Sequence, residues 1–469
     1  MSDWMESDTF KAQYNGAEDF AGRVPRPDEF PEDPSTSRSY WIRNHTIELD
    51  QIWRDRALPE ETDVVIIGSG ITGAVVAFQL SEQQPDIRVA LLEARGICTG
   101  ATGRNGGHIC RPEVCHFDET VQAFGDEDAM RLKKFAIRNR DMMIECIEKL
   151  DATEKVSLRL NGTVVVFETE NERDAFQKDI DYATSKGYKS EGYIIGPEEA
   201  ATKLDLDASR TNFGAAILEK SGTIFPRKFV DVLLQTALRR MPSLTIHPYT
   251  AVESVSRPDS NNSLYKAHTT RGVIQSKAIF HATNAYAGHL NVDLQGADGV
   301  FGAKGHMLGI NPNVTGCRKQ LQQGFGYGDF WHYLQQRPGN GPFLYGFATA
   351  ELLNDYDDRI TLPADHEVRA KMLGFLERMF PEWFQNLDIS RDVPYDWTGI
   401  QGFTMTGASI VGRPSKDSLG EFASVGHNGE GMGRCFASAT VATEAMIAYL
   451  LGKSYQTPDW FPEAFRRNI

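Results

Sequence analysis

The pattern of apolar and polar positions changes several times between residues 62 and 93. The run Val64–Ile67 consists mainly of β-branched residues and has the unbroken apolar character of a strand buried on both faces. Ala74–Ser81 is apolar on nearly every side, as in a buried helix, and a second apolar run follows at Val89–Leu92. This order predicts a strand–helix–strand unit with two parallel strands.

Later patterns predict elements of both kinds. Helical periodicity is found at Asp118–Leu150, Asn171–Lys186, Pro197–Leu204, Phe229–Met241, Asp365–Phe380 and Arg434–Leu451. Strands are expected at Ala215–Thr223, Leu244–His247, Thr250–Val255 and Phe422–Val425, with a hairpin formed by Tyr265–Thr270 and Gly272–Ser276. Leu158–Glu168 predicts a second hairpin that turns at Asn161-Gly162. Alternating glycine and aromatic residues across 301–350 predict an antiparallel sheet.

Glycines at fixed spacing open the first predicted helix. Gly68 permits a tight turn, Gly70 lets a pyrophosphate approach the backbone, and Gly73 lets helix and strand pack closely. Glu93 ends the second strand, where a carboxylate accepts hydrogen bonds from ribose hydroxyls and repels a 2′-phosphate. These features predict a site for FAD or NAD rather than NADP. A glycine-rich turn without a ligand is the alternative, and the order of strand, motif, helix, strand and acid argues against it.

Composition narrows the class of protein. The 469 residues allow two or three domains, and a net charge of −15 argues against nucleic acid and anionic membrane surfaces as partners. Apolar runs are too short to span a membrane, and the acidic N-terminus resembles no signal peptide, so we expect a cytoplasmic location. The six cysteines show no metal-binding spacing and are expected to be reduced, with no metal site. Residues 1–60 are expected to form a leader that packs on the body of the protein from Ser39 onward.

Two more glycine-rich segments bear on the cofactor. One follows Glu93 directly and contains GATGRNGGH at 100–108, which is expected to lie over the cofactor; a mobile surface loop is the alternative. The other places Gly426, Gly429, Gly431 and Gly433 before the last helix, which presents a second helix N-terminus. A nicotinamide enzyme needs one dinucleotide cradle, whereas a flavoenzyme uses a second one near the flavin ring. The presence of two glycine-led helix N-termini therefore favours FAD.

Four motifs carry a family resemblance: VVIIGSGITG with Glu93, GATGRNGGH, IFHATNAYAGHL at 279–290, and WTGIQGFTMTGASIVG with GHNGEGMG at 397–433. In this order they resemble the D-amino-acid-oxidase-like (DAO) FAD-dependent oxidoreductases, which include sarcosine, glycine, D-amino-acid and γ-glutamylputrescine oxidases. GATGRNGGH is most similar to the γ-glutamylputrescine oxidase branch, and the leader ending in SYWI is similar to fungal members.

The resemblance implies an α/β (α+β) fold in which a Rossmann-type FAD-binding domain carries an inserted mixed or antiparallel sheet that binds substrate. The FAD-binding domain would comprise 61–154, 226–294 and 396–469, and the substrate-binding domain 155–225 and 295–395. The implied cofactor-binding residues are Gly68, Gly70, Ile71, Thr72, Gly73, Glu93, Ala94, Arg95, Thr102, Arg104, Asn105, Gly106, Gly107, His108, Val252, Thr283, Asn284, Gly399, Gly429, Gly431 and Met432.

Departures from the family matter for the cofactor and the substrate. The position where several relatives attach flavin to a cysteine reads Tyr395-Asp396-Trp397 here, so FAD is expected to be non-covalent; Cys98 and His108 leave another link open. The segment after Trp397 lacks the arginine with which amino-acid oxidases commonly hold a carboxylate. This absence favours an amine, or an amino group remote from the carboxylate.

The resemblance also suggests residues for the chemistry. Lys304, His306 and Trp397 are catalytic candidates, and His108, Tyr333, Tyr345 and Trp397 are substrate candidates, with Trp331 and His332 as further aromatic neighbours. Lys304 could stabilise reduced oxygen or be a solvated strand lysine. His306 could orient substrate or satisfy a buried backbone group, and aromatic residues in a sheet are often plain core.

The implied reaction is oxidation of a C–N bond in a small amine or amino acid. Hydride would pass to flavin N5, leaving an imine, and dioxygen would reoxidise the flavin to give hydrogen peroxide. A flavin-dependent dehydrogenase with another electron acceptor, a nicotinamide dehydrogenase and a non-catalytic FAD-binding module stay open as alternatives. The sequence also leaves the oligomeric state open between monomer and homodimer.

Overall fold

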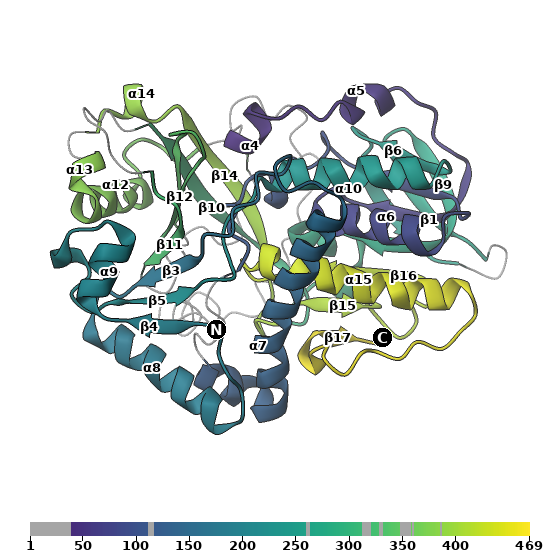
Figure 1. Ribbon diagram of the computed structural model, residues 1–469. Helices are drawn as coiled ribbons and strands as arrows, with labels where there is room; N and C mark the ends of the chain where they lie inside the picture. Colours follow the sequence, from purple (N-terminus) through teal and green to yellow (C-terminus); the bar gives the residue numbers. More distant parts are fainter. Residues whose placement is uncertain are drawn as a thin grey trace.

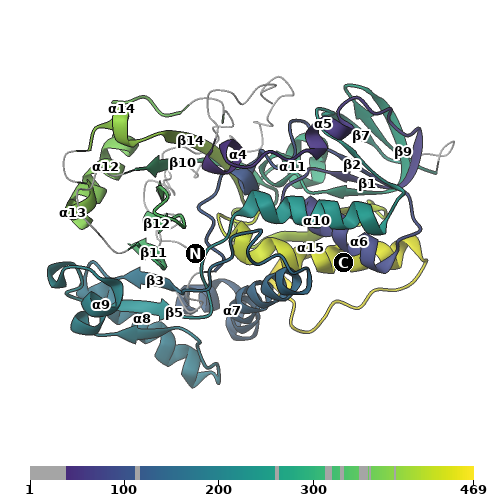
Figure 2. The same ribbon diagram turned by 45° about the horizontal axis from the view of Figure 1, so that its top comes forward.

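Two β-sheets with their helices make up the two halves of the molecule (Figure 1). The computed structural model describes residues 39–110, 117–258, 263–311, 320–327, 332–347, 358, 361–384 and 387–469. The predicted leader therefore lies outside the described residues up to position 38. Figure 2 shows the long helix α7 (Phe117–Lys149) near the boundary between the halves.

The first sheet is built around the predicted strand–helix–strand unit. Its strands, in spatial order, are β17 (Arg466–Arg467), β15 (Ile410–Gly412), β16 (Glu421–Val425), β9 (Gly272–His281), β1 (Glu61–Ile67), β2 (Val89–Leu92) and β6 (Leu244–His247). The hairpin of β7 (Val252–Ser256) and β8 (Tyr265–Thr269) extends the sheet beside β9. β1 pairs in parallel with both β2 and β9, as expected of unbroken apolar strands.

Three helices cover one face of the first sheet: α6 (Ile71–Gln83), α10 (Pro226–Arg240) and α15 (Gly431–Leu450) (Figure 1). α6 is buried on most sides because α10 and α15 both pack against it. This explains the nearly unbroken apolar sequence of α6. Val75 and Val76 of this helix are fully buried in the largest hydrophobic cluster of the described residues.

The second sheet is mixed. Its strands, in spatial order, are β14 (Tyr395–Phe403), β10 (Phe301–Ile310), β13 (Phe343–Phe347), β12 (His332–Gln336), β11 (Gly324–Tyr327), β3 (Thr163–Val166), β5 (Ala215–Leu218) and β4 (Tyr193–Ile195). The neighbouring pairs from β14 to β11 are antiparallel, whereas β11 pairs with β3 in parallel. The predicted α/β (α+β) fold class with two sheets is confirmed.

The predicted hairpin at Leu158–Glu168 is wrong. Only β3 forms there, and it pairs with β11 and β5, while Arg159 makes an isolated bridge to Thr223. Gly162 has φ +91°, so the chain does turn at the Asn-Gly pair. The segment before the turn has a better partner in the loop after β5, and local turn chemistry is overridden by tertiary pairing.

β14 departs from the expected division of the chain. The predicted boundary between the two domains fell at 395/396, but β14 pairs along most of its length with β10 of the second sheet. Gly402 at the far end of β14 would place a Cβ 2.5 Å from Asn284 Oδ1, so this end touches the loop after β9 of the first sheet. β14 thus links the second sheet to the first.

The segment before β1 packs on both halves. It contains two short helices, α4 (Tyr40–Arg43) and α5 (Leu49–Trp53). Trp41 is fully buried with Phe225, Met307, Leu344 and Trp397.

The remaining helices lie on the outside of the second half or beside the sheets. They are α8 (Glu170–Ser185), α9 (Pro197–Leu204), α11 (Ala287–Leu290), α12 (Glu367–Met379), α13 (Pro381–Phe384) and α14 (Ile389–Asp392). α7 bends at Gly125, whose φ of +78° is not helical. Within the described part of the chain, none of the helices has both the length and the apolar character needed to cross a bilayer.

Candidate functional site

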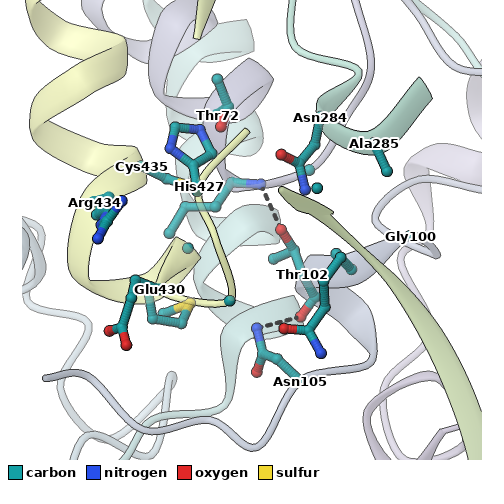
Figure 3. A pocket seen from close by; sticks show the side chains of 18 of the residues that line it. Thr72, Gly100, Thr102, Asn105, Asn284, Ala285, His427, Glu430, Arg434 and Cys435 are labelled. Atoms are coloured by element: carbon teal, nitrogen blue, oxygen red, sulfur yellow. Dashed lines mark hydrogen bonds between the residues drawn. The ribbon is translucent and has the colours of Figure 1, made fainter. Parts of the chain in front are cut away.

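One cavity of about 480 Å³ runs between the two sheets. At one end, which we call the motif end, it is lined by Gly68 and Glu93 of the first sheet's loops and by Val252 at the start of β7. At the other, the sheet end, it is lined by Met307, Tyr333 and Gly399 of the second sheet. In Figure 3, Thr102 and Asn105 lie on one side of the cavity, opposite His427 and Arg434.

Most of the predicted cofactor residues line this cavity. They are Gly68, Gly70, Ile71, Thr72, Glu93, Ala94, Arg95, Thr102, Arg104, Asn105, Gly106, Gly107, His108, Val252, Thr283, Asn284, Gly399, Gly429, Gly431 and Met432. Gly73 does not line it. A Cβ at Gly73 would lie 1.9 Å from the carbonyl oxygen of Gly68. The absence of a side chain at Gly73 therefore lets α6 pack closely against the turn that precedes it.

At the motif end, Glu93 is held by the turn it faces. Its Oε2 accepts hydrogen bonds from the backbone N–H of Ser69 at 3.0 Å and from Ser69 Oγ at 2.6 Å, and its Oε1 accepts from the N–H of Arg95 at 3.0 Å. The carboxylate still lines the cavity, so it has a fixed orientation and lone pairs left for a ligand's hydroxyl groups. This is the geometry expected at the ribose of a dinucleotide.

The residues at the N-terminus of α6 line the cavity. Its N-cap is Gly70, which provides no side-chain hydrogen bond to the first turn. A Cβ at Gly70 would come 3.1 Å from Thr102 Oγ1, so the absence of a side chain keeps the cradle open. Thr102 Oγ1 accepts from the N–H of Ile71 at 3.0 Å (Figure 3). The turn fits a pyrophosphate, since it combines exposed backbone with the positive end of a helix dipole.

The glycine-rich loop at 100–108 is held by its carbonyl groups. Four consecutive carbonyl oxygens each accept a hydrogen bond from a side chain outside the loop. The pairs are Ser39 Oγ with Gly103, Trp397 Nε1 with Arg104 at 2.7 Å, Trp41 Nε1 with Asn105 at 2.6 Å, and Gln335 Nε2 with Gly106. The loop is therefore a buried wall of the cavity and does not lie on the surface.

Two arginines of this region share one carboxylate. Arg95 Nη1 lies 2.9 Å from both oxygens of Asp358, and Arg104 Nε lies 3.4 Å from Asp358 Oδ2. Arg104 also donates to the carbonyl of Thr398 on β14 at 2.9 Å. The three side chains are buried, so this pairing joins the loops of the first sheet to the second sheet.

At the sheet end, small residues keep the wall close to the loop. A Cβ at Gly399 would lie 2.9 Å from Arg104 Cβ, and one at Gly305 would lie 2.7 Å from Gln401 Nε2. Gly305 is paired with Gly399 across β10 and β14. Gly399 lets the second sheet approach the glycine-rich loop at Arg104, and Gly305 leaves room for the side chain of Gln401 on the neighbouring strand.

Lys304 and His306 lie on the opposite face of β10. Gly305 and Met307 line the cavity, and because side chains alternate along a strand, the residues between them point outward. His306 Nε2 lies 2.7 Å from Asp396 Oδ1, and the other oxygen of Asp396 pairs with Arg369 of α12. The expectation that Lys304 and His306 face the reacting end is therefore wrong. Side chains alternate between the two faces of a strand, and these two lie on the face turned away from the cavity.

Trp397 and Tyr345 do not line the cavity either. Trp397 is fully buried and donates to the loop carbonyl of Arg104, so it supports the wall from behind. Tyr345 is on the outer face, where its hydroxyl lies 2.6 Å from His332 Nδ1 and its ring stacks on Phe375 of α12. His332 belongs to the same outer stack, and Trp331 lies outside the described residues.

Two of the predicted substrate residues do lie at the sheet end, and both carry uncharged side chains. His108 and Tyr333 both line the cavity, with ring centroids 6.0 Å apart. Burial lowers the pKa of His108 to about 4, although its Nε2 hydrogen bond to the carbonyl of Leu334 at 3.3 Å opposes the shift. Burial also raises the pKa of Tyr333 above its usual range. A neutral imidazole and a protonated phenol therefore face this space near neutral pH.

The second helix N-terminus lies beside the sheet end. α15 begins after Glu430 without a side-chain cap, and Gly429 before it has φ +74°. A Cβ at Gly429 would lie 3.0 Å from Gln401 Oε1 of β14. The start of α15 thus meets the second sheet at the cavity, and its dipole favours negative charge there.

Several lining residues were not predicted from the sequence. His427, in the GHNGEGMG motif, is buried against Ser409 Oγ at 3.1 Å, and burial lowers its pKa to about 3. Phe124, Leu132 and Ala136 of α7 also line the cavity, although the sequence predicted only a helix there and no part in the site. The amphipathic pattern of α7 located an apolar face but not what that face meets.

Comparisons with known proteins agree with this architecture. A family model described as FAD dependent oxidoreductase matches residues 63–445. The probable oxidoreductase OrdL of Haemophilus influenzae is 21% identical over 403 residues, which are 83% of each chain. The gamma-glutamylputrescine oxidoreductase of Escherichia coli is 23% identical over 231 residues, 48% of this chain and 50% of that protein. The crystal structure of glycine oxidase from Geobacillus kaustophilus superimposes with a TM-score of 0.66 at 20% identity, covering 85% of this chain and 97% of that one.

Proposed function

The chain belongs to the DAO family of FAD-dependent oxidoreductases, and from this premise we propose that it oxidises a C–N bond of a small amine or amino acid. The proposed products are an imine and, with dioxygen as electron acceptor, hydrogen peroxide. The relatives whose names mention amines or amino acids support this choice of substrate, since they share its fold or part of its sequence.

One observation carries the proposal. A single cavity joins a dinucleotide cradle at the motif end to a space at the sheet end where the uncharged side chains of His108 and Tyr333 lie. The residues at the motif end, Glu93 and the start of α6, would hold the adenosine and pyrophosphate of FAD. Gly399, Gly429 and Met432 would lie at the ring. When bound, FAD supplies a two-electron acceptor that takes hydride from the carbon next to an amine nitrogen.

The residues at the sheet end would select the neutral form of the amine. His108 is uncharged at neutral pH because burial lowers its pKa to about 4, and it can accept a hydrogen bond from an amine N–H. Tyr333 keeps its proton and can donate one. An ammonium group would lose its hydration here. Positioning of this kind needs little further acid–base machinery.

FAD is proposed to be held without a covalent bond. Cys98 does not line the cavity, and burial raises its pKa to about 12, which disfavours the thiolate. Cys110 and Cys435 do line it. Acid precipitation separates the two cases: free flavin should stay in the supernatant, whereas yellow colour in the pellet would show a covalent link.

The test begins with the visible spectrum of the purified protein. The protein should be yellow, or become so on reconstitution with FAD. Anaerobic mixing with primary, secondary and cyclic amines and with amino acids should bleach the flavin band for one class of compound. Admission of air should then restore the colour with release of one peroxide per imine.

Three outcomes would count against the proposal. A protein that cannot be reconstituted with FAD would contradict the cofactor. Bleaching without reoxidation by air, but with reoxidation by a quinone, would identify a dehydrogenase. Bound FAD that no amine or amino acid bleaches would favour a non-catalytic binding module.

A further inference from the structure

The cavity does not end at the second sheet. Beyond the start of α15 it continues along α7, where it is lined by Phe124, Leu132, Ala136 and Phe465. We call this part the α7 arm. It lies outside the cradle formed by the glycine motifs, so the proposed cofactor contacts do not account for it.

The apolar lining of the arm comes from one face of a helix. Leu132 and Ala136 are four residues apart on α7, and Phe124 lies before Gly125, where the helix bends. All three side chains are half-buried in the protein alone. A ligand in the arm would therefore remove further apolar surface from water, which is the main source of affinity for an apolar group.

The arm is formed before any ligand binds. Asn139 of α7 is fully buried; its Nδ2 donates to the carbonyl of Met432 at 2.9 Å, and its Oδ1 accepts from the N–H of Ala437 at 3.0 Å. These two bonds fix α7 against the first turns of α15. A pre-formed wall reduces the entropy lost on binding.

Polar groups also line the cavity near the arm. Lys133, Glu430 and Arg434 are half-buried there, and Arg434 Nη1 donates to the carbonyl of Gly407 at 2.9 Å. The lining along α7 is therefore apolar at Leu132 and Ala136 and polar at Lys133.

We infer that the α7 arm is a subsite for an apolar substituent of the substrate. The inference rests on the proposed function and narrows it: the substrate is an amine or amino acid carrying an aliphatic or aromatic group of several carbons. Its nitrogen lies at the sheet end near His108 and Tyr333, and the substituent extends along Leu132 and Ala136. A compound as small as glycine would leave the arm unfilled.

Binding of unreactive ligands tests the subsite separately from catalysis. Straight-chain primary amides, from propanamide to heptanamide, are neutral, carry an NH₂ group and cannot give up hydride from a C–H beside an amine. They are titrated into the FAD-loaded protein without oxygen, and the shift of the visible flavin spectrum gives the dissociation constant. We expect this constant to fall about fourfold for each added methylene group.

Two variants of α7, each replacing an alanine by phenylalanine, provide a matched pair. Ala136→Phe fills the arm and should abolish the dependence on chain length. Ala123→Phe adds the same side chain at an exposed position of the same helix and should leave that dependence unchanged. Leu132→Ala is the second variant in case Ala136→Phe does not retain FAD. It should weaken heptanamide binding at least about fivefold and leave propanamide unchanged.

The outcomes distinguish the two proposals. If chain length has no effect in the unmodified protein, if no amide binds, or if the arm variants keep the full dependence, the subsite is wrong even where an amine bleaches the flavin. If the dependence is present and is lost in the arm variants, the subsite stands even where no amine is oxidised, and then only the proposed function fails.

Discussion

The two ends of the cavity are built in different ways. At the motif end, the groups that meet the ligand come largely from one strand–helix–strand unit, with Glu93 held by the turn at Ser69. At the sheet end, His108, Met307, Tyr333 and Gly399 come from four separate segments of the chain. The first end depends on local sequence, and the second depends on register, strand face and packing.

The glycine-rich loop shows how the ends are coupled. Its carbonyl groups accept from Ser39, Trp41, Gln335 and Trp397, which belong to the leader and to the second sheet. Its threonine, Thr102, meets the start of α6. Removing a group at the motif end should therefore weaken FAD binding most, whereas changes behind the loop should lower folding stability more than FAD binding.

The largest effect is expected at Glu93. Glu93→Ala removes the carboxylate that is proposed to hold the ribose and leaves Ser69 and Arg95 without their acceptor. Charged hydrogen bonds of this kind are worth about 1.5–3 kcal/mol each, so the dissociation constant of FAD should rise roughly a hundredfold. It is measured by titrating the FAD-free protein and following the quenching of flavin fluorescence.

Glu93→Gln is the matched control. Glutamine keeps the length of the side chain and one acceptor oxygen, so this variant should lose less FAD affinity than the alanine variant. An unchanged dissociation constant in Glu93→Ala would contradict the placement of the ribose.

A smaller effect is expected from the two tryptophans behind the loop. Trp397→Phe and Trp41→Phe keep an aromatic ring but leave the carbonyl of Arg104 or Asn105 without its donor. An unsatisfied buried carbonyl costs about 1–3 kcal/mol, so the free energy of unfolding should fall by that amount. FAD affinity should fall less than in Glu93→Ala. Urea unfolding of the FAD-free protein measures the first quantity.

Trp460→Phe serves as the comparison for these two variants, because Trp460 is half-buried and packs against Phe135, away from the loop. If all three substitutions changed the unfolding free energy and FAD affinity equally, the hydrogen bonds to the loop would have no special role.

Two buried histidines that line the cavity, His108 and His427, predict a dependence of stability on pH. Burial lowers the pKa of His108 from 6.5 to about 4 and that of His427 to about 3. Between the folded and unfolded pKa values the unfolded chain binds more protons, so the free energy of unfolding falls as pH is lowered. The stabilisation is complete above 6.5 and is lost as pH falls toward 4.

Urea midpoints at about pH 7 and about pH 5 measure this effect. His108→Gln removes one of the groups, so its midpoint should fall less between the two values than that of the unmodified protein. An equal fall in both proteins would show that His108 does not titrate in this window.

The smallest effect is expected from Lys304. Lys304→Met changes a buried residue on the outer face of β10, so FAD affinity and the rate of flavin reoxidation by air should change less than about twofold. Stopped-flow absorbance measures the reoxidation rate. A drop of tenfold or more would show that Lys304 acts on the cavity in spite of its position.

Much of the motif end could be predicted because its signals are local. Gly68, Gly70 and Glu93 stand at fixed distances along a strand, a turn and a helix, and each residue type is required by the backbone at that position. Gly73 was assigned to packing by the same reasoning, and its position against Gly68 agrees. The hairpin at Leu158–Glu168 failed because an Asn-Gly turn does not determine which strand its arms will join.

The sequence alone determined the fold class, the cradle and the dinucleotide. The signals for them are the hydrophobic periodicity, the spacing of the glycines and the acidic residue at the end of the second strand, and all three are properties of residues close together in the chain. Only the tertiary structure decided which side chains face the reacting end. Lys304 and His306 alternate with Gly305 and Met307 on one strand, and the sequence does not say which face of the second sheet meets the first. Packing of β14 against the glycine-rich loop decides which face this is, because Gly399, paired with Gly305 of β10, leaves room for Arg104 of the loop.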